Sequence, residues 1–223
     1  MGFCMGVRRA VRIVENVLNR LDEVEKPIYT LGPLIHNRLV IEDLRNKGVI
    51  QVSGPEYVEG GTVIIRAHGV GPRIKTRIRE KQAELVDATC PKVLRSQGKV
   101  KKYSRKGYAV IIVGDADHGE VQGLAGYAER STIIQTAEDA RSLTIPNKCM
   151  VIGQTTLDEQ CYKELSGIIR KRGKNVEVVD SICASVAKRQ KALREVAGKV
   201  DALIIIGGKN RDKKKNLYTT AVS

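Results

Sequence analysis

The chain has 223 residues, enough for one large domain or a few small packed ones with a substantial core. Its longest apolar runs, such as 202–206, are too short to span a membrane, so the sequence predicts no membrane segment. The net charge of +14 points to an anionic partner, whereas the absence of Trp and the single Phe disfavour stacking of nucleic-acid bases on aromatic side chains.

Helical and strand-like hydrophobic patterns alternate along the chain. The patterns predict helices at 7–21, 38–47, 91–106, 159–172 and 184–196, and strands at 28–31, 49–52, 62–66, 108–113, 150–152, 176–179 and 202–206. This alternation is typical of an α/β protein with mostly parallel sheets. The N-terminal segment carries arginines in an amphipathic pattern instead of an apolar signal core, which indicates a cytoplasmic protein.

Three of the five cysteines, Cys4, Cys90 and Cys183, lie at turns directly before predicted helices. Helix N–H groups favour a thiolate over a thiol at such a position. The intervals are similar, 86 residues between the first two and 93 between the last two. They suggest three α/β units, 1–86, 87–175 and 176–223, each offering one sulfur to a shared centre. From spacing alone, that centre is either a zinc ion with an open position or an iron–sulfur cubane with one free iron.

The other two cysteines have a simpler interpretation. Cys149 lies in a predicted strand and Cys161 on a predicted helix, where a lone cysteine is most often a small buried apolar residue.

The three histidines all follow strands. His68 and His118 come just after apolar strands, and His36 follows one by a turn. Ligands of α/β proteins collect beyond the carboxyl ends of strands, and imidazoles can hydrogen-bond to phosphate oxygens. The alternative for each histidine is that it only caps a turn.

Two further polar residues are candidates for catalysis. Glu120 lies in a Gly-flanked loop two residues after His118, and it could donate a proton if it were buried; an isolated glutamate is more often a solvated surface charge. Thr155 follows Gln154 just beyond a strand, where it could equally be a helix cap.

Seven short motifs then occur in order along the chain. They are Gly-Phe-Cys-Met-Gly-Val at 2–7, Leu-Ile-His-Asn at 34–37, Ala-His-Gly-Val at 67–70, Asp-Ala-Thr-Cys-Pro at 87–91, His-Gly-Glu-Val at 118–121, Gln-Thr-Thr at 154–156, and Ile-Cys at 182–183 with Arg189-Gln190. Together they resemble the 4-hydroxy-3-methylbut-2-enyl diphosphate reductase (LytB/IspH) family of the non-mevalonate isoprenoid pathway. The resemblance reaches as far as Asn210.

The resemblance implies a trefoil of three α/β units around a [4Fe–4S] cluster held by Cys4, Cys90 and Cys183. It implies that His36, His68 and His118 line a diphosphate pocket, that Glu120 delivers protons, and that Thr155 holds the hydroxyl end of the substrate. The implied reaction removes that hydroxyl reductively and gives isopentenyl and dimethylallyl diphosphate. Reduced ferredoxin or flavodoxin is the implied electron donor, and its acidic surface suits a basic protein.

The chain departs from the family pattern in four places. Val186 and Ala187 replace threonines, and Arg211-Asp212-Lys213 replaces a Ser-Ser-Asn segment that grips the diphosphate. The strand before Cys4 and the elements beyond Ser223 are absent, so the third unit is expected to be incomplete.

A non-catalytic homologue that binds RNA or another anion is the alternative. Arg95, Lys99, Lys102 and Lys106 are predicted to share one helix face. With Tyr103 the only aromatic residue nearby, nucleic-acid binding is not favoured, and a zinc hydrolase is the third possibility.

Overall fold

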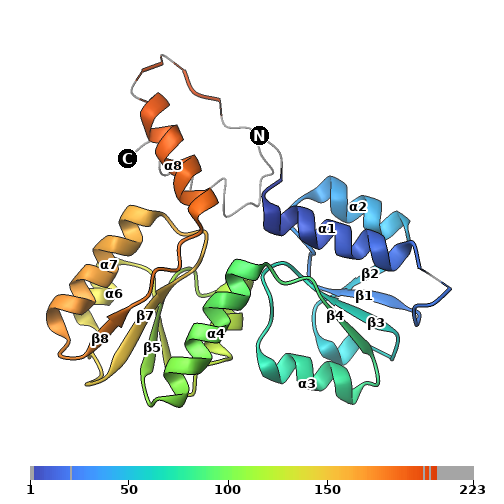
Figure 1. Ribbon diagram of the computed structural model, residues 1–223, viewed down its shortest axis with the longest axis horizontal. Coiled ribbons are helices and arrows are strands. Elements are labelled where there is room, and N and C mark those ends of the chain that lie inside the picture. The colour runs from blue at the N-terminus through green and yellow to red at the C-terminus, as the bar shows by residue number, and fades with distance from the viewer. Residues whose placement is uncertain (1–2, 21, 198, 201, 205–223) are drawn as a thin grey trace. The chain divides into compact units, whose positions relative to one another are not determined.

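The computed structural model describes residues 3–20, 22–197, 199–200 and 202–204. The predicted strand at 202–206 therefore lies partly outside the described residues, and Arg211-Asp212-Lys213 lies wholly outside them. The chain divides into two compact units, Met1–Arg95 (unit 1) and Ser96–Ser223 (unit 2). Each unit is described by itself below (Figure 1).

Unit 1 is built on a four-stranded parallel sheet. Its elements are α1 (Met5–Leu18), β1 (Ile28–Leu31), α2 (Arg38–Asn46), β2 (Val49–Val52), the 3₁₀ helix η1 (Pro55–Tyr57), β3 (Thr62–Ile65), α3 (Pro72–Glu80) and β4 (Glu84–Asp87). The strand order is β2-β1-β3-β4, and every neighbouring pair is parallel. Helix α4 (Pro91–Arg105) begins in unit 1 directly after Cys90.

Unit 2 repeats this plan. After α4 come β5 (Ala109–Val113), α5 (Gly119–Ala125), β6 (Ser131–Ile134), α6 (Ala137–Ser142), β7 (Cys149–Gly153), α7 (Glu159–Arg172), β8 (Val176–Val178) and α8 (Ala184–Ala197). The strand order β6-β5-β7-β8 corresponds one for one to that of unit 1, and all pairs are again parallel. The predicted α/β class with parallel sheets is confirmed. The predicted division at residues 86 and 175 stays a prediction.

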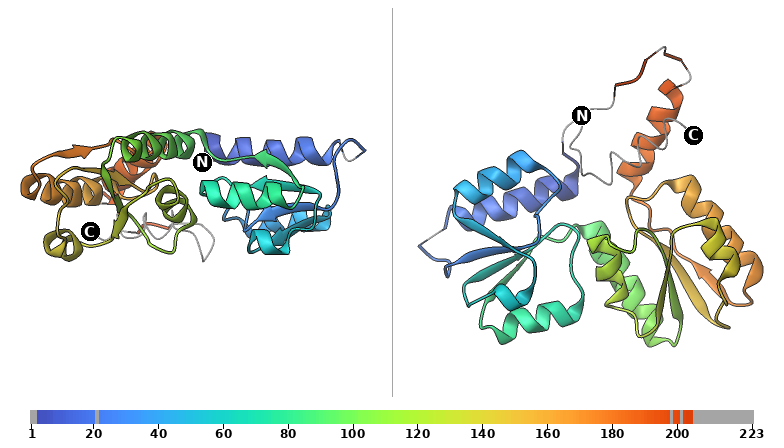
Figure 2. Two further views of the ribbon diagram at one scale, coloured as in Figure 1. Left: turned by 90° about the horizontal axis from the view of Figure 1, so that it is seen from below. Right: turned by 180° about the vertical axis from the view of Figure 1, so that it is seen from behind.

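Both sheets are covered by helices on their two faces, as Figures 1 and 2 show for each unit. In unit 1, alternate strand residues pack against α1 and α2 on one face and α3 on the other, because side chains of a strand point alternately to opposite sides. In unit 2, α6 and α7 cover one face, and α4 and α5 cover the other. This double burial explains the uninterrupted apolar sequence of β5, whose five residues are all buried.

Local sequence signals explain where several helices begin. Asp158 accepts hydrogen bonds from the backbone N–H groups of Gln160 and Cys161 and so caps α7. Thr136 and Asp139 form a reciprocal capping box at α6. Within the described ranges, no helix is both long and apolar enough to cross a lipid bilayer.

Candidate functional site

The three candidate cysteine ligands occupy equivalent positions, each at the start of a helix. The backbone carbonyls of Cys4, Cys90 and Cys183 accept hydrogen bonds from the N–H groups of Arg8, Leu94 and Ala187, four residues further on, and that of Cys183 also accepts from Val186. These are N-cap positions, where the N–H groups of the first turn of a helix stabilise negative charge. Cys4 and Cys90 belong to unit 1, and Cys183 belongs to unit 2.

Cys90 is held tightly within unit 1. The backbone N–H of Cys90 donates to the carbonyl of Ala67 at 2.9 Å, which extends the β3–β4 pairing beyond the ends of both strands. On its other side Cys90 contacts Gly6 of α1, where a Cβ atom added to the glycine would lie 2.5 Å from the sulfur. The segment that carries Cys4 and the segment that carries Cys90 therefore pack together, and only glycine fits at position 6.

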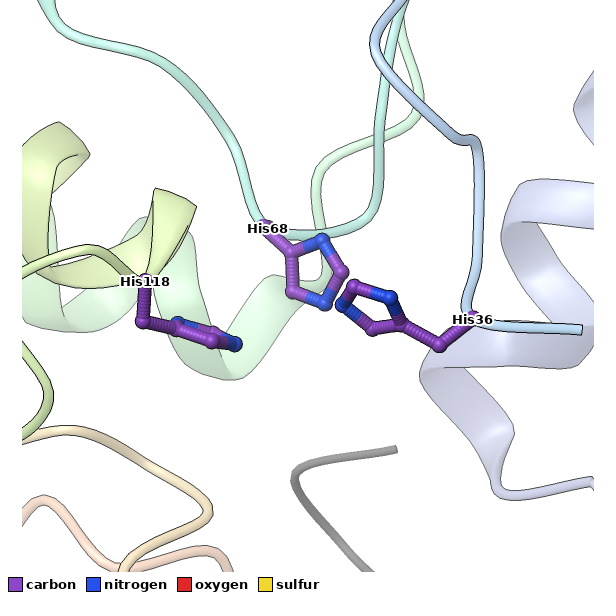
Figure 3. A group of neighbouring side chains, drawn as sticks. All are labelled: His36, His68 and His118. Carbon is purple, nitrogen blue, oxygen red and sulfur yellow. The ribbon is translucent and has the colours of Figure 1, made fainter. Parts of the chain in front are cut away.

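His36 and His68 lie side by side in unit 1. Their ring centroids are 4.6 Å apart, with the ring planes inclined by 44°, and both side chains are partly exposed (Figure 3). His36 follows β1 and His68 follows β3, which are neighbouring parallel strands. The structure thus brings together two of the three predicted histidines at the carboxyl ends of adjacent strands. The third histidine labelled in Figure 3, His118, belongs to unit 2.

In unit 2, Glu120 and Thr155 form a buried pair. The Glu120 carboxylate accepts a hydrogen bond from the Thr155 backbone N–H at 2.7 Å and another from its hydroxyl at 2.9 Å. Glu120 is 1% exposed and Thr155 is 4% exposed. The surface-charge alternative for Glu120 is therefore wrong, and so is the helix-cap alternative for Thr155, because Asp158 caps the following helix.

The Glu120–Thr155 pair is hydrogen-bonded to two other candidate site residues, Cys183 and His118. The carbonyl of Thr155 accepts a hydrogen bond from the backbone N–H of Cys183 at 2.8 Å. His118 caps α5, since its Nδ1 accepts from the backbone N–H of Glu120 at 3.2 Å. Glu120 consequently lies in the first turn of a helix and not in the predicted loop. All four predicted site residues of unit 2 belong to one hydrogen-bonded chain.

Because the strand order is the same in both units, a histidine and a cysteine lie at equivalent positions in each. His36 and His118 both lie five residues beyond the first strand of their sheet, β1 or β5. Cys90 and Cys183 both follow the fourth strand, β4 or β8. Each unit therefore offers an imidazole and a thiol at the carboxyl edge of a parallel sheet, the edge where α/β proteins bind ligands.

Sequence analysis missed several residues that shape the site. In unit 1 these are Gly6 and Arg9, and in unit 2 Ser181 and Gln190. The hydroxyl of Ser181 accepts from the backbone N–H of Gly153 at 2.8 Å. The buried amide of Gln190, part of a motif with no predicted role, donates to the carbonyl of Leu157 at 3.3 Å and so ties α8 to the loop after Thr155.

The two remaining cysteines fit their predicted structural role. Cys149 is fully buried in β7, and Cys161 is partly buried on α7 against the same apolar cluster. Burial raises the pKa of both thiols. Neither is suited to hold a metal as a thiolate.

The basic helix considered for RNA binding is α4. Arg95 and Lys102 are exposed on it, whereas Lys99 is partly buried and donates to the carbonyl of Asp180. The ring of Tyr103, the one aromatic side chain of this helix, packs edge-on against the ring of Tyr108, with 5.0 Å between the ring centroids. The described helix therefore offers charge but no open stacking platform for bases.

Comparisons with known proteins identify the relatives of this chain. A family model described as LytB protein matches residues 1–223. The 4-hydroxy-3-methylbut-2-enyl diphosphate reductase of Aquifex aeolicus is 39% identical over 221 residues, which cover 97% of this chain and 75% of that protein. The enzyme of the same name from Treponema denticola is 38% identical over 234 residues, covering 100% of this chain and 81% of the relative.

Solved structures give the same result. The E-1-hydroxy-2-methyl-but-2-enyl-4-diphosphate reductase of Plasmodium falciparum matches with a TM-score of 0.93 at 29% identity, over 99% of this chain and 70% of that one. A structure of (E)-4-hydroxy-3-methyl-but-2-enyl diphosphate reductase, the terminal enzyme of the non-mevalonate pathway, matches with a TM-score of 0.77 at 38% identity, over 99% of this chain and 79% of that one. With a family match along its whole length and relatives near 40% identity, this chain belongs to the LytB protein family.

Proposed function

We propose that this chain is a 4-hydroxy-3-methylbut-2-enyl diphosphate reductase. The reaction takes up two electrons and two protons, breaks the bond between carbon and the allylic hydroxyl, and releases water with isopentenyl or dimethylallyl diphosphate. The observation that carries the proposal is the chain of contacts from Glu120 through Thr155 to Cys183, because it links an acid, a hydroxyl and a candidate metal ligand. Membership of the LytB family supports it.

Cys4, Cys90 and Cys183 would hold a [4Fe–4S] cluster. Three observations fit such a group: each cysteine stands at a helix N-terminus, the sulfur of Cys90 leaves room only for glycine at position 6, and each has a backbone fixed by hydrogen bonds. When bound, the cluster supplies electrons and one iron that acts as a Lewis acid on the substrate hydroxyl. A zinc site would supply the Lewis acid but not the electrons.

Glu120 and Thr155 are proposed to deliver the proton to the leaving hydroxyl. Oε2 of Glu120 lies 2.9 Å from the hydroxyl oxygen of Thr155. When Glu120 is protonated, its O–H can donate to this oxygen while the Thr155 hydroxyl turns and passes its own proton to the substrate oxygen. The backbone N–H of Thr155 keeps the other carboxyl oxygen in place at 2.7 Å. Burial of both side chains keeps bulk water away from this transfer.

His36, His68 and His118 are proposed to bind the diphosphate. Imidazole N–H groups hydrogen-bond to phosphate oxygens, and each histidine lies beyond the carboxyl end of a sheet strand. The net charge of +14 favours both the anionic substrate and an acidic electron donor, for which we propose reduced ferredoxin or flavodoxin in the cytoplasm.

The test is reconstitution with iron and sulfide in the absence of oxygen, followed by assay of both elements and of turnover. We expect about four iron and four sulfide per chain, and formation of both products with a reduced donor. Cys90→Ser should lose iron, whereas Cys161→Ser, the matched control, should keep it. Glu120→Gln should keep iron but lose turnover. A colourless chain that binds zinc, or an iron-loaded chain that forms neither product, would refute the proposal.

A further inference from the structure

One face of α1 lies along the segment that leads into Cys90. Gly6, Arg9 and Ala10 share this face, since residues three and four apart are neighbours on a helix. Gly6 contacts Cys90, and Ala10 belongs to the same buried apolar cluster as Ala88. The first turns of the helix that Cys4 begins therefore rest on residues 87–90.

Arg9 makes the polar contacts of this face. Its Nη1 donates to the carbonyl oxygen of Thr89 at 3.0 Å, and its Nη2 donates to that of Asp87 at a longer 3.5 Å. The planar guanidinium can reach two carbonyls of one segment at once, which a lysine ammonium on a flexible stem does less well. Arg8, the adjacent residue, is exposed and makes no comparable contact among the hydrogen bonds described for this helix.

The same segment is fixed from its other sides. The backbone N–H of Ala88 donates to the carbonyl of Ile65, the last residue of β3, and that of Cys90 donates to the carbonyl of Ala67, just beyond β3. The Asp87 carboxylate accepts from the backbone N–H of Thr89 at 2.9 Å and from Lys75 at 2.6 Å. Those bonds tie the segment to the sheet and to α3, but among the described hydrogen bonds only those of Arg9 tie it to α1.

We propose that Arg9 is a positioning residue for Cys90. By binding the carbonyls of residues 87 and 89, it fixes the sulfur of Cys90 against the N-terminus of α1, where Cys4 lies. The spacing of two metal ligands is thereby set by a side chain that touches neither. This inference rests on the proposed function, in which both cysteines bind iron. Groups that orient metal ligands in this way typically change metal affinity by about 10- to 100-fold when removed.

The experiment compares Arg9→Met with Arg8→Met, because both remove one positive charge from adjacent positions on one helix. In the metal-free proteins, amide hydrogen exchange at Ala88 and Cys90 should be faster in Arg9→Met than in Arg8→Met or the wild type. Exchange in the strands of unit 2 should be the same in all three, which separates a local effect from general destabilisation.

The reconstituted proteins supply the second readout. A chelator should remove iron about 10- to 100-fold faster from Arg9→Met than from Arg8→Met, and the electron paramagnetic resonance spectrum of the reduced centre should change only in Arg9→Met. Arg9→Lys should restore part of the retention. Equal iron release and identical spectra in the two methionine variants would overturn the inference while leaving the proposed function standing. If the wild type bound no iron, the proposed function and the ligand-positioning role would both fail.

Discussion

Replacement of Gly6 by alanine tests how closely α1 and Cys90 are packed. The added methyl group would lie 2.5 Å from the sulfur of Cys90 and 3.2 Å from its Cβ atom. Ordinary van der Waals contact lies between 3.4 and 4 Å, so the sulfur or the helix must move by close to an ångström. Cys90 cannot simply yield, because its backbone N–H is bonded to Ala67 and its side chain is too short to swing aside without changing rotamer.

The expected size of the effect follows from two opposing terms. Overpacking in a close-packed site costs about 1–3 kcal/mol. Alanine is favoured over glycine in a helix interior by about 1 kcal/mol, and by less in the first turn, where position 6 lies. We therefore expect Gly6→Ala to lower the free energy of unfolding by about 1–2 kcal/mol and to release iron faster.

Gly98→Ala on α4 is the matched control for this prediction. Apart from its chain neighbours and the backbone of its own helix, no atom lies within 4 Å of the methyl group it would add, and Gly98 is exposed, so only the helix propensity should act. We expect Gly98→Ala to raise the free energy of unfolding by about 0.8–1.0 kcal/mol. Urea unfolding of the metal-free proteins measures both changes. If Gly6→Ala were as stable as the wild type, or gained as much as Gly98→Ala, the argument that Cys90 closes this space would be refuted.

Three further predictions concern single contacts. Thr155→Val removes the hydroxyl donor to Glu120, so turnover should fall by about 10²-fold or more while iron content stays at the wild-type level; unchanged turnover would contradict the proposed proton path. Tyr162→Phe removes a buried hydroxyl that donates to the carbonyl of Val179, just beyond β8, at 2.6 Å, and it should lower the free energy of unfolding by about 1 kcal/mol at pH 7. Burial raises the pKa of Tyr162, so this stabilisation should fade above about pH 10, where the unfolded chain loses the phenol proton; a pH-independent difference in urea unfolding would count against it. Lys75→Met removes the ion pair with Asp87 and should lower the free energy of unfolding by about 1–2 kcal/mol. Burial alone would raise the pKa of Asp87, but Lys75 and Thr89 more than offset it, so the stabilisation should be present at neutral pH and be lost as the pH falls below about 4; thermal unfolding between pH 3 and 7 measures this.

Elements with strong periodic patterns were predicted from sequence almost to the residue. The helix predicted at 159–172 is observed as Glu159–Arg172, and the strand predicted at 28–31 as Ile28–Leu31. Sequence analysis missed α3, whose nine residues contain only two apolar side chains, and the short pair β6 and α6, which carry little periodic signal.

The sequence predicted which residues are candidates for the site, but it did not predict the contacts that those residues make. Glu120 was expected in a loop because glycine precedes it, whereas a histidine cap, which is not a usual N-cap residue, starts a helix there. The contact of Arg9 with Thr89 joins residues 80 positions apart, and nothing distinguishes Arg9 from Arg8 until the helix is placed on its neighbour. Local propensity and motif spacing cannot supply such long-range contacts.

The position of Cys90 after the last strand of the first sheet has a consequence for the order of folding. A parallel pair cannot form until its crossover is complete, and β4 pairs with β3, which pairs in turn with β1. Because the Cys90 amide binds Ala67 only beyond the end of the β3–β4 ladder, this thiol should reach its final place late, after the sheet has assembled. Pulsed hydrogen exchange during refolding would show Cys90 protected after Tyr29 and Val63. If folding follows this order, the metal would bind to a unit 1 that has already folded and would stabilise it. A zinc finger differs, because its chain stays unfolded until zinc binds.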